Sequence, residues 1–427
     1  MSSSARDRAA APVVVSGSGV VSPIGVGLAA FEEALFAGRS AVRAHAVDLP
    51  GLDVPLVPLA AAEFDAASVA APSRLPLDRA TAMALAAAEE AARHARLADA
   101  SVDGERLGVF WGSGMAGAST FEMTCRTVYA ERRRMRPTSV VTTMPNAPTA
   151  ELALRFGARG AALAYACACA SSAVAIGEAM RAIRAGWIDI AIAGGSESLL
   201  TPGVVASWQA MRVLAPLAPG GAAGDAARAC RPFAPDRTGF ALGEAAAAFI
   251  LESAEHARAR GAASHWQLAG YATNCDGVHI TNPDPAGQAR AMRAALADAG
   301  LAPGEIGHLN AHGTATRAGD AAEAQSIAAV FGPHGVPVTA TKAIHGHLLG
   351  AGGAVELLAA ACALVARRLP QTANTSTVDP TLALDLVTGR SRPSPGLRHA
   401  MSNAFAFGGT NAVLVASCSA PTAASPP

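Results

Sequence analysis

Apolar residues occur along the chain in short runs that end in glycine, and longer alanine-rich segments separate these runs. The runs at 13–15, 109–111 and 188–192 each lead toward a glycine turn. Short apolar runs bounded by glycine are typical of buried strands, and the longer segments between them are typical of helices. The pattern therefore predicts an α/β protein. Further runs of the same type lie at 244–253, 304–314, 335–342 and 411–419.

The alanine-rich segments carry helical periodicity. In the segment 172–185, Ile176, Met180 and Ile183 recur at a spacing that places them on one helix face. One long segment, 215–239, lacks such a pattern, and a loop of this length predicts a functional surface rather than a simple connector. The predicted helices span 78–96, 172–185, 286–300, 318–331 and 348–367.

Size and composition limit the classes of protein that need to be considered. A chain of 427 residues exceeds the usual size of one hydrophobic core, so two packed halves are expected. The 33 basic residues balance 33 acidic residues, which gives no support for a nucleic-acid-binding protein. The longest apolar segment, 348–366, begins with glycines and contains Glu356, so we interpret it as a buried helix and not a membrane span.

The seven cysteines are odd in number and lack the spacing of a disulfide framework, which indicates a reducing, cytoplasmic compartment. Two of them, Cys167 and Cys169, lie in the stretch AYACACASSAVAIGEAM. A metal site is disfavoured, because the pair supplies only two ligands and no second pair is nearby. Buried, unreactive cysteines are the alternative interpretation.

The position of Cys169 favours a nucleophile over a packing residue. An extended run turns there into a helix that starts with small residues. A helix N-terminus stabilises a thiolate and lowers the thiol pKa, and its free N–H groups can bind an oxyanion. We assign Cys167, which lies behind the turn, to packing.

Two histidines complete a candidate set for nucleophilic catalysis. The stretch LNAHGTATRAGDAAE places His312 directly after a predicted strand, and TKAIHGHLLGAGGAVE places His347 at the start of a predicted helix. A helix N-terminus keeps a histidine neutral. A cysteine nucleophile needs such groups to handle protons and developing charge.

The motifs CACASSAVAIGEA, GGSES, RPFAPDRTGFALGEAA, NAHGTATRAGDAAE, TKAIHGHLLGAGGAVE and SNAFAFGGTNA occur in this order. From about residue 13 to 415 the chain resembles the chain-elongating β-ketoacyl-acyl-carrier-protein synthases, discrete type II ketosynthases of the thiolase superfamily. The resemblance implies a thiolase fold, an α/β architecture of two pseudo-symmetric halves in a five-layered α-β-α-β-α arrangement with stacked five-stranded sheets. We expect the nucleophile half at 12–257, the histidine half at 258–418, and tails at 1–11 and 419–427.

The resemblance also implies the activity of an acyltransferase that forms C–C bonds. A decarboxylative Claisen condensation would join an acyl-enzyme thioester to malonyl-acyl-carrier protein and give a β-ketoacyl-carrier protein two carbons longer, in fatty-acid synthesis. The triad would be Cys169, His312 and His347, with the histidines donating through Nε2 to the enolate. The N–H groups of Cys169 and Phe407 would hold the oxyanion, and Phe407 would gate the site.

Further roles follow from the same resemblance. Lys342 would support the histidines electrostatically, paired with Glu356 or Glu323. Three threonines would bind the pantetheine arm, and two bulky residues would shape an acyl pocket for short or planar chains. Carrier proteins are acidic, so Arg74, Arg79 and Arg212 are candidates for the docking surface, as is the basic cluster ERRRMR at 131–136. A solvated loop is the alternative interpretation of that cluster. The threonines are Thr281, Thr314 and Thr316, and the pocket residues are Met115 and Trp208.

The implied substrates travel on the phosphopantetheine of an acyl carrier protein, so no free cofactor and no metal is expected. The expected partners are this carrier protein, malonyl and acyl thioesters, and a second copy of the chain in a homodimer, or a related subunit in a heterodimer; neither nucleic acid nor a membrane is expected. Three departures from the family pattern lie outside the triad: Cys167 in place of threonine, Ala406 in place of glycine, and FALGEAAAA in place of FGxGEGAG. We expect Ala406 to stiffen the gate.

Three related classes are disfavoured by single residues. A degradative thiolase would need a second catalytic cysteine near the C-terminus, and AFAFGGTN contains none. Chain-initiating synthases have asparagine where this chain has His347, and a chain-length factor lacks the nucleophile that Cys169 would supply. The alternatives left open are a discrete ketosynthase of a type II polyketide or polyene pathway, and a ketosynthase-like partner subunit of a heterodimer.

Overall fold

The computed structural model describes residues 12–47, 56–99, 102–217, 223–264 and 266–418. Its main strands form two sets with the same order and the same directions. In each set two parallel pairs are followed by two antiparallel pairs, which gives the two halves one topology. The first set runs β6 (Ala162–Tyr165), β5 (Leu107–Gly112), β7 (Ile190–Glu197), β9 (Ala245–Glu252), β1 (Val13–Ser22), and the second β12 (Pro337–Thr339), β11 (His308–Asn310), β16 (His399–Phe405), β17 (Thr410–Cys418), β10 (Trp266–Cys275).

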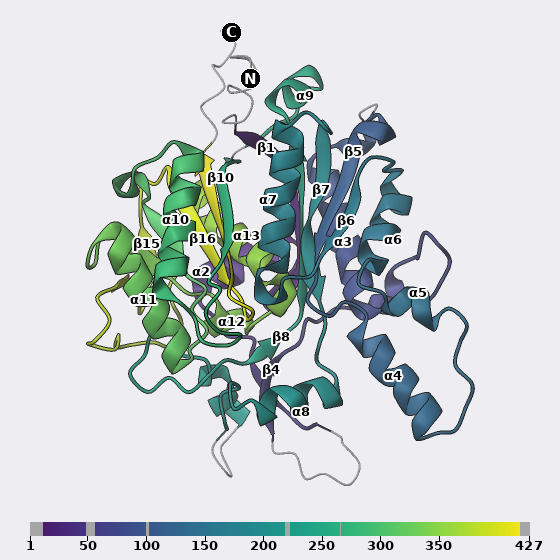
Figure 1. The fold of residues 1–427 in the computed structure, drawn as a ribbon, viewed down its shortest axis with the longest axis horizontal. Coiled ribbons are helices and arrows are strands. Elements are labelled where there is room, and N and C mark those ends of the chain that lie inside the picture. The colour runs from purple at the N-terminus through teal and green to yellow at the C-terminus, as the bar shows by residue number, and fades with distance from the viewer. Residues whose placement is uncertain (1–11, 48–55, 100–101, 218–222, 265, 419–427) are drawn as a thin grey trace.

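Helices fill the space between the two strand sets and cover both outer faces, as Figure 1 shows. The central pair is α7 (Ser171–Arg184) and α13 (Gly352–Ala366), which pack on each other and on strands of both halves. The helices α3 (Arg79–His94) and α6 (Ala147–Phe156) cover the first set. On the far side lie α10 (Pro285–Ala299) and α11 (Arg317–Phe331). This arrangement confirms the expected two-halved α/β fold.

The two strand sets are not separate sheets, which differs from the expectation. The antiparallel pair β1–β10 joins them at one end, with Val13 opposite Leu268 and Val15 opposite Trp266. The first strands of the two halves therefore lie side by side, and the sheet path continues from one half to the other. One more short strand, β14 (Asp385–Leu386), extends the second set beyond β12.

The first strand is also longer than its apolar run at 13–15. It continues to Ser22 through Gly17 and Gly19, which the sequence pattern assigns to a turn. A Cβ atom at Gly17 would lie 2.0 Å from the carbonyl oxygen of Ala91, and one at Gly19 would lie 2.1 Å from that of Ala87. These glycines therefore allow α3 to pack directly on the strand, which explains why they occur in the middle of it.

The central helices are buried on nearly every side, because each lies between two sheets. In α7 the residues Ile176, Met180 and Ile183 are buried as predicted, and so are residues on the other faces of the helix. The helix Leu349–Ala366, which includes the turn before α13, is apolar and long enough to cross a membrane. It is 83% buried inside the protein, as is typical of a core helix.

The remaining elements connect or border this core. They are β2 (Gly25–Val26), α2 (Leu28–Ala37), β3 (Arg43–His45), β4 (Val57–Ala60), α4 (Ala118–Tyr129), α5 (Ser139–Thr143), α8 (Pro202–Ala210), β8 (Leu242–Gly243), α9 (Ala254–Ala259), α12 (Lys342–His345), β13 (Arg368–Leu369) and β15 (Arg392–Pro393), with short 3-10 turns between some of them.

Candidate active site

The candidate nucleophile lies in a tight turn between β6 and α7. A 3-10 turn, Ala168–Ala170, precedes the helix, and Ala168 has a left-handed backbone with φ 47°. The second half repeats this arrangement before α13, where the turn is Leu349–Ala351 and Leu349 also has φ 47°. Few non-glycine residues adopt this conformation unless the surrounding structure imposes it. Cys169 and Gly350 therefore occupy equivalent positions in the two halves.

The structure brings Cys169, His312 and His347 together, although they are far apart in the sequence. Nε2 of His347 lies 3.1 Å from Sγ of Cys169. The ligand atoms of all three residues lie within 4.8 Å of one another, and all three side chains are buried. The two imidazole rings are nearly perpendicular, with centroids 5.3 Å apart.

The pKa of the Cys169 thiol differs from the sequence-based expectation. Burial raises it to about 12, although the positive charge of Lys342 and the backbone N–H at Cys169 lower it. The expected effect of the turn is therefore present, but desolvation outweighs it. Burial and the charge of Lys342 also hold the pKa values of His312 and His347 well below their ordinary value. Near neutral pH the site therefore contains a thiol and two neutral imidazoles.

His347 is not at the start of α13, because the turn at 349–351 separates it from the helix. Its neutral state arises from burial and charge. Nδ1 of His347 accepts a hydrogen bond from the N–H of Leu349, 3.3 Å away. An imidazole nitrogen that accepts carries no proton in the neutral ring, so the proton of His347 is on Nε2 and points toward Cys169.

Lys342 fixes the tautomer of His312 in the same way. It is fully buried, and its ammonium contacts the carbonyl oxygen of His312, a carboxylate oxygen of Glu356 and, at 3.3 Å, Nδ1 of His312. An ammonium group has three donors and no acceptor, so Nδ1 of His312 must accept and the proton is on Nε2. Among the 33 basic residues of the whole chain, Lys342 is the only lysine.

Of the two candidate acids, Glu356 pairs with Lys342, whereas Glu323 holds the loop that carries His312. Glu323 accepts hydrogen bonds from the backbone N–H groups of His312 and Gly313, both at 2.8 Å, and from Asn403 at 3.1 Å. Each histidine is thus fixed through its backbone or Nδ1, which leaves Nε2 free to face the cavity.

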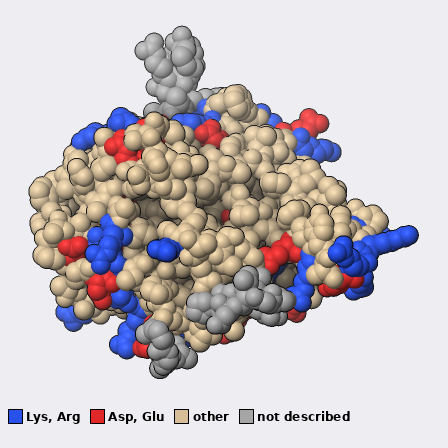
Figure 2. Space-filling view, turned by 60° about the horizontal axis from the view of Figure 1, so that its bottom comes forward, with Lys and Arg blue, Asp and Glu red and all other residues tan. Residues whose placement is uncertain are grey.

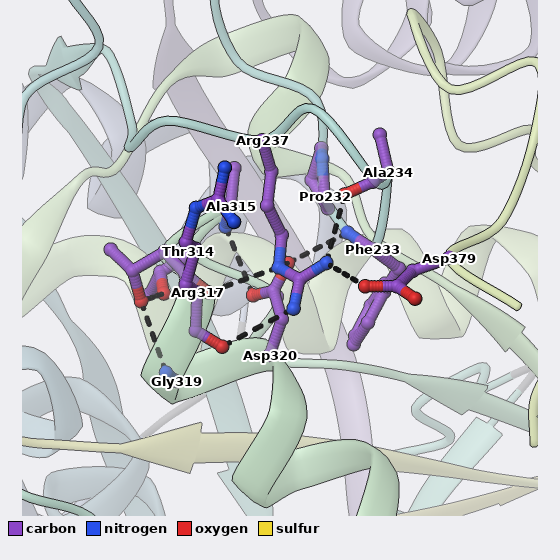
Figure 3. Close-up of polar contacts among 12 residues, drawn as sticks. Pro232, Phe233, Ala234, Arg237, Thr314, Ala315, Arg317, Gly319, Asp320 and Asp379 are labelled. Carbon is purple, nitrogen blue, oxygen red and sulfur yellow. Dashed lines mark hydrogen bonds and ion pairs between the residues drawn. The ribbon is translucent and has the colours of Figure 1, made fainter. Parts of the chain in front are cut away.

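A second network, absent from the sequence-based prediction, braces the same loop (Figure 3). Buried Asp320 accepts from the N–H groups of Phe233, at 2.6 Å, and Ala315, at 3.0 Å. Buried Arg237 donates to the carboxylate of Asp379 at 2.7 Å and to the backbone carbonyl oxygens of Ala234, Thr316 and Arg317. The segment 215–239 is therefore partly a buried support, not only a surface, and its residues 218–222 lie outside the described part.

A cavity of about 280 Å³ opens above the three residues. Thr281, Thr314 and Thr316 line it together with Trp208 and Phe407. The hydroxyls of Thr314 and Thr316 lie 2.9 Å apart, and Thr316 also caps α11 by accepting from the N–H of Gly319. Thr281 is exposed on a loop that also lines this cavity.

An aromatic cluster forms one wall of this cavity. The rings of Trp208 and Phe407 are stacked with centroids 6.2 Å apart, and Trp208 meets Phe240 edge to face at 5.8 Å. Phe240 in turn meets the ring of His347 at 4.9 Å. The sequence reasoning missed Phe240, and its only signal was its position within the motif RPFAPDRTGFALGEAA. The cluster brings a flat, apolar surface next to the candidate triad.

Two sequence-based candidates lie elsewhere. Met115 does not line this cavity, and its side chain is 52% exposed. Arg79 binds the buried carboxylate of Glu244 through two hydrogen bonds of 2.7 and 2.8 Å, so it is not free to dock a partner. Arg212 is exposed beside Thr316 and Arg317. Figure 2 shows the basic side chains of this face in separate groups.

In the segment 406–409, which follows β16, Gly408 and Gly409 have left-handed conformations, with φ 86° and 77°. Ala406 is not among the residues with positive φ, so its side chain is compatible with this conformation of the loop. Within the described residues, neither the N–H of Cys169 nor that of Phe407 donates to another protein atom. Both N–H groups are therefore available to a substrate.

The three residues could also be considered as metal ligands. They would need a fourth ligand to complete a tetrahedral site. The ammonium of Lys342, 3.3 Å from Nδ1 of His312, places a positive charge where a cation would be disfavoured. The donor set therefore suits the stabilisation of negative charge better than the binding of a cation.

Comparisons with known proteins agree with this chemistry. The family model described as "Beta-ketoacyl synthase, N-terminal domain" matches residues 10–257, and the model of the C-terminal domain matches residues 265–376. The chain is 38% identical to 3-oxoacyl-[acyl-carrier-protein] synthase 2 of Staphylococcus aureus, over 79% of this chain and 84% of that protein. It is 37% identical to Nodulation protein E of Rhizobium leguminosarum bv. trifolii, over 94% and 98% of the two chains.

Solved structures give the same result. The ishigamide ketosynthase/chain length factor has a TM-score of 0.86 at 30% identity, over 96% of this chain and 99% of that chain. A β-ketoacyl synthase from Burkholderia phymatum STM815 has a TM-score of 0.85 at 32% identity, over 96% and 100%. A type II PKS ketosynthase in complex with its acyl-carrier protein, AntDE:AntF, has a TM-score of 0.85 at 28% identity, over 96% and 99%.

The substitution Lys342→Met tests the electrostatic role of the buried ammonium. Because Lys342 lowers the pKa of Cys169, its removal raises that pKa further and reduces the thiolate fraction at any pH below it. We expect alkylation of Cys169 by iodoacetamide at pH 8 to slow about tenfold, the effect of one pKa unit. Mass spectrometry of the peptide that contains Cys169 measures this rate. Arg212→Met is the control for loss of an exposed charge, and an unchanged or faster rate in Lys342→Met would contradict the assignment.

Proposed function

This chain belongs to the β-ketoacyl synthase family, and on that premise we propose that Cys169, His312 and His347 perform its condensation reaction. The enzyme is an acyltransferase that forms C–C bonds in fatty-acid elongation. It condenses an acyl-enzyme thioester with malonyl-acyl-carrier protein, with loss of carbon dioxide. The observation that carries the assignment of residues is the convergence of Sγ of Cys169 with one ring nitrogen each of His312 and His347, which together line one cavity.

In the first half-reaction, Sγ of Cys169 attacks the thioester carbonyl of the acyl group on the carrier protein. The free N–H groups of Cys169 and Phe407 receive the oxyanion. The S–C bond to the pantetheine arm then breaks, and the proton of the Cys169 thiol balances the departing pantetheine thiolate. The Nε2–H of His347, 3.1 Å from Sγ, stabilises negative charge on the sulfur before attack.

In the second half-reaction, the carboxylate of the malonyl group leaves as carbon dioxide and its electron pair forms an enolate. Two Nε2–H donors, on His312 and His347, can bind the enolate oxygen, since both Nδ1 atoms are engaged as acceptors. The enolate carbon attacks the acyl carbonyl on Cys169, and the C–S bond breaks. The product is a β-ketoacyl-carrier protein two carbons longer, and Cys169 regains a proton from water.

Thr314, Thr316 and Thr281 are proposed contacts of the pantetheine arm, because they line the same cavity as the triad. The carrier supplies both substrates, so the proposal includes no free cofactor. We place the enzyme in a reducing, cytoplasmic compartment, because all seven cysteines, which lie within the described residues, are unpaired. The proposed halves are 12–257 and 258–418.

A polyketide or polyene pathway is the second candidate, and the aromatic wall favours it. A conjugated chain is flat and can pack against the rings of Trp208 and Phe407, whereas a saturated chain gains less from aromatic contact. The type II PKS ketosynthase of AntDE:AntF, a structural neighbour, supports the polyketide alternative. The acyl chain, not the reaction, separates the two pathways.

The exposed edge of the first strand set supports a dimer. The strand β6 has no further neighbour within the described residues, and its Leu163 is 46% exposed. In the same half of the chain, the side chains of Phe121 and Met123 on α4 are 60% and 62% exposed. An unpaired strand beside exposed apolar side chains favours association with another subunit. We propose a homodimer across this edge.

Loading of Cys169 tests the proposed nucleophile. On incubation with acyl-carrier protein, the wild-type chain should gain an acyl group on the peptide that contains Cys169, measured by mass spectrometry. Cys169→Ala should lose this adduct and reduce condensation by about 10⁴-fold or more. Cys167→Ala is the matched control and should still be acylated. An acylated or fully active Cys169→Ala variant would overturn the assignment.

Substitution of Trp208 tests the acyl pocket. Trp208→Ala removes the indole from the cavity wall, so longer and more flexible chains should load onto Cys169, while loading of a polyenoyl chain should fall. A panel of acyl-carrier proteins, read by intact mass, measures both changes. Trp187→Ala is the matched control, because Trp187 is 74% exposed and lies outside the cavity. Identical chain profiles for Trp208→Ala and the wild type would refute this role.

Sedimentation velocity tests the dimer. The wild-type chain should sediment at twice its mass of 42.7 kDa. Leu163→Asp places a charge on the exposed edge strand and should yield monomers. Val26→Asp is the control, because Val26 is also apolar and exposed but lies in β2, and it should leave the dimer intact. A wild-type monomer that dimerises only with a related subunit would instead support the heterodimer.

A further inference from the structure

Near the triad, a second group of hydrogen-bond donors points to one buried carboxylate, that of Glu197. Glu197 is the last residue of β7 and is fully buried. Its oxygens accept from the N–H of Gly114 at 2.5 Å, the N–H of Met115 at 3.2 Å, the hydroxyl of Ser113 at 3.2 Å and the N–H of Gly350 at 3.1 Å. The sequence reasoning quoted the motif GGSES but assigned no role to this residue.

The four donors come from both halves of the chain. The loop 113–115 follows β5, and Gly350 lies in the turn before α13. In the common topology this turn is equivalent to the turn that carries Cys169, and the loop after β5 is equivalent to the loop after β11 that carries His312. Glu197 therefore lies at the pseudo-symmetric counterpart of the reaction centre. There its carboxylate accepts the hydrogen bonds of the local donors.

This carboxylate is connected to the triad through the backbone. Gly350 follows Leu349, whose left-handed backbone directs its N–H to Nδ1 of His347. A Cβ atom at Gly350 would lie 2.3 Å from the N–H nitrogen of Gly114 and 2.5 Å from Glu197, so the packing leaves little room for rearrangement. Ser113 connects Glu197 to the nucleophile turn as well. Its N–H donates to the carbonyl oxygen of Tyr165, the last residue of β6, and the turn that carries Cys169 follows this strand.

We propose that Glu197 is a positioning residue of the condensation, which holds the turn at 349–350 so that His347 keeps its proton on Nε2 and directs it to the reaction centre. The inference rests on the proposed function of His347. Glu197 touches no substrate and acts through Gly350 and Leu349. Its four hydrogen bonds link the two halves of the chain.

The electrostatic effect of Glu197 has the opposite sign. The charged groups that set the pKa of Cys169 are Lys342, which lowers it, and Glu356 and Glu197, which raise it. A carboxylate at this place therefore works against the thiolate. Burial raises the pKa of Glu197 itself to about 7, while its four donors favour the ionised form. The positioning role and the electrostatic effect of Glu197 can thus be measured separately. Loss of its negative charge should slow condensation but should favour the thiolate of Cys169 by lowering its pKa.

Glu197→Gln is the main test. Glutamine keeps the shape but presents an NH₂ group to N–H donors, so we expect condensation to fall at least tenfold. Loss of the negative charge should lower the pKa of Cys169, so alkylation by iodoacetamide should reach its midpoint at lower pH. The matched control is Glu252→Gln, because Glu252 is equally buried but bonds to Arg260 and His256. That control should leave the alkylation profile of Cys169 unmoved.

Glu197→Ala provides a second arm, since formate can occupy the place of the lost carboxylate. Added formate should restore part of its condensation and should leave the wild type unchanged. Wild-type condensation in Glu197→Gln, or a loss without a shift of the alkylation profile and without rescue, would overturn the inference. Failure of the wild type to become acylated on Cys169 would instead refute the proposed function, so the two failures are distinct.

Discussion

The site depends on one buried ammonium group. Lys342 binds the backbone carbonyl and Nδ1 of His312 and the carboxylate of Glu356, and it is fully buried. Burial of an ion pair seldom adds to stability, because desolvation offsets the attraction. The gain is functional, since this charge fixes a tautomer and, together with burial as the larger cause, holds the pKa values of both histidines well below their ordinary value. Arginine provides every other basic side chain. Its planar group would not match three acceptors around a single nitrogen, which explains why lysine occurs here.

Pseudo-symmetry explains why such distant residues meet. Each half turns from its strand β6 or β12 toward a central helix, and α7 and α13 pack on each other. The turns before these helices therefore lie close together at the same end of the layers. One turn carries Cys169, and the other lies two residues after His347. The counterpart of the reaction centre holds Glu197, which binds one of two similar sets of donors, and in the proposed function the other set would bind substrate.

The sequence predicted the elements and the triad better than it predicted their environment. Apolar periodicity located α7 and the strands, because burial determines both pattern and structure. It misplaced the end of β1, where Gly17 and Gly19 serve packing against α3. The helix-terminus argument gave the wrong direction for the Cys169 pKa, because desolvation depends on how many layers cover a residue. Glu197 was missed, since its donors come from segments far apart in the chain.

In the proposed function, the interactions that would select the acyl chain differ in kind from those that would carry out the reaction. The hydrogen bonds around His312 and His347 involve backbone atoms and buried charges, which tolerate few substitutions. The cavity wall consists of aromatic side chains, and their exchange changes the shape of the pocket without disturbing those bonds. Phe240 touches both Trp208 and His347, so it connects the aromatic wall of the cavity to the hydrogen-bonded histidines. Chain preference can therefore diverge through Trp208 while the condensation chemistry remains the same.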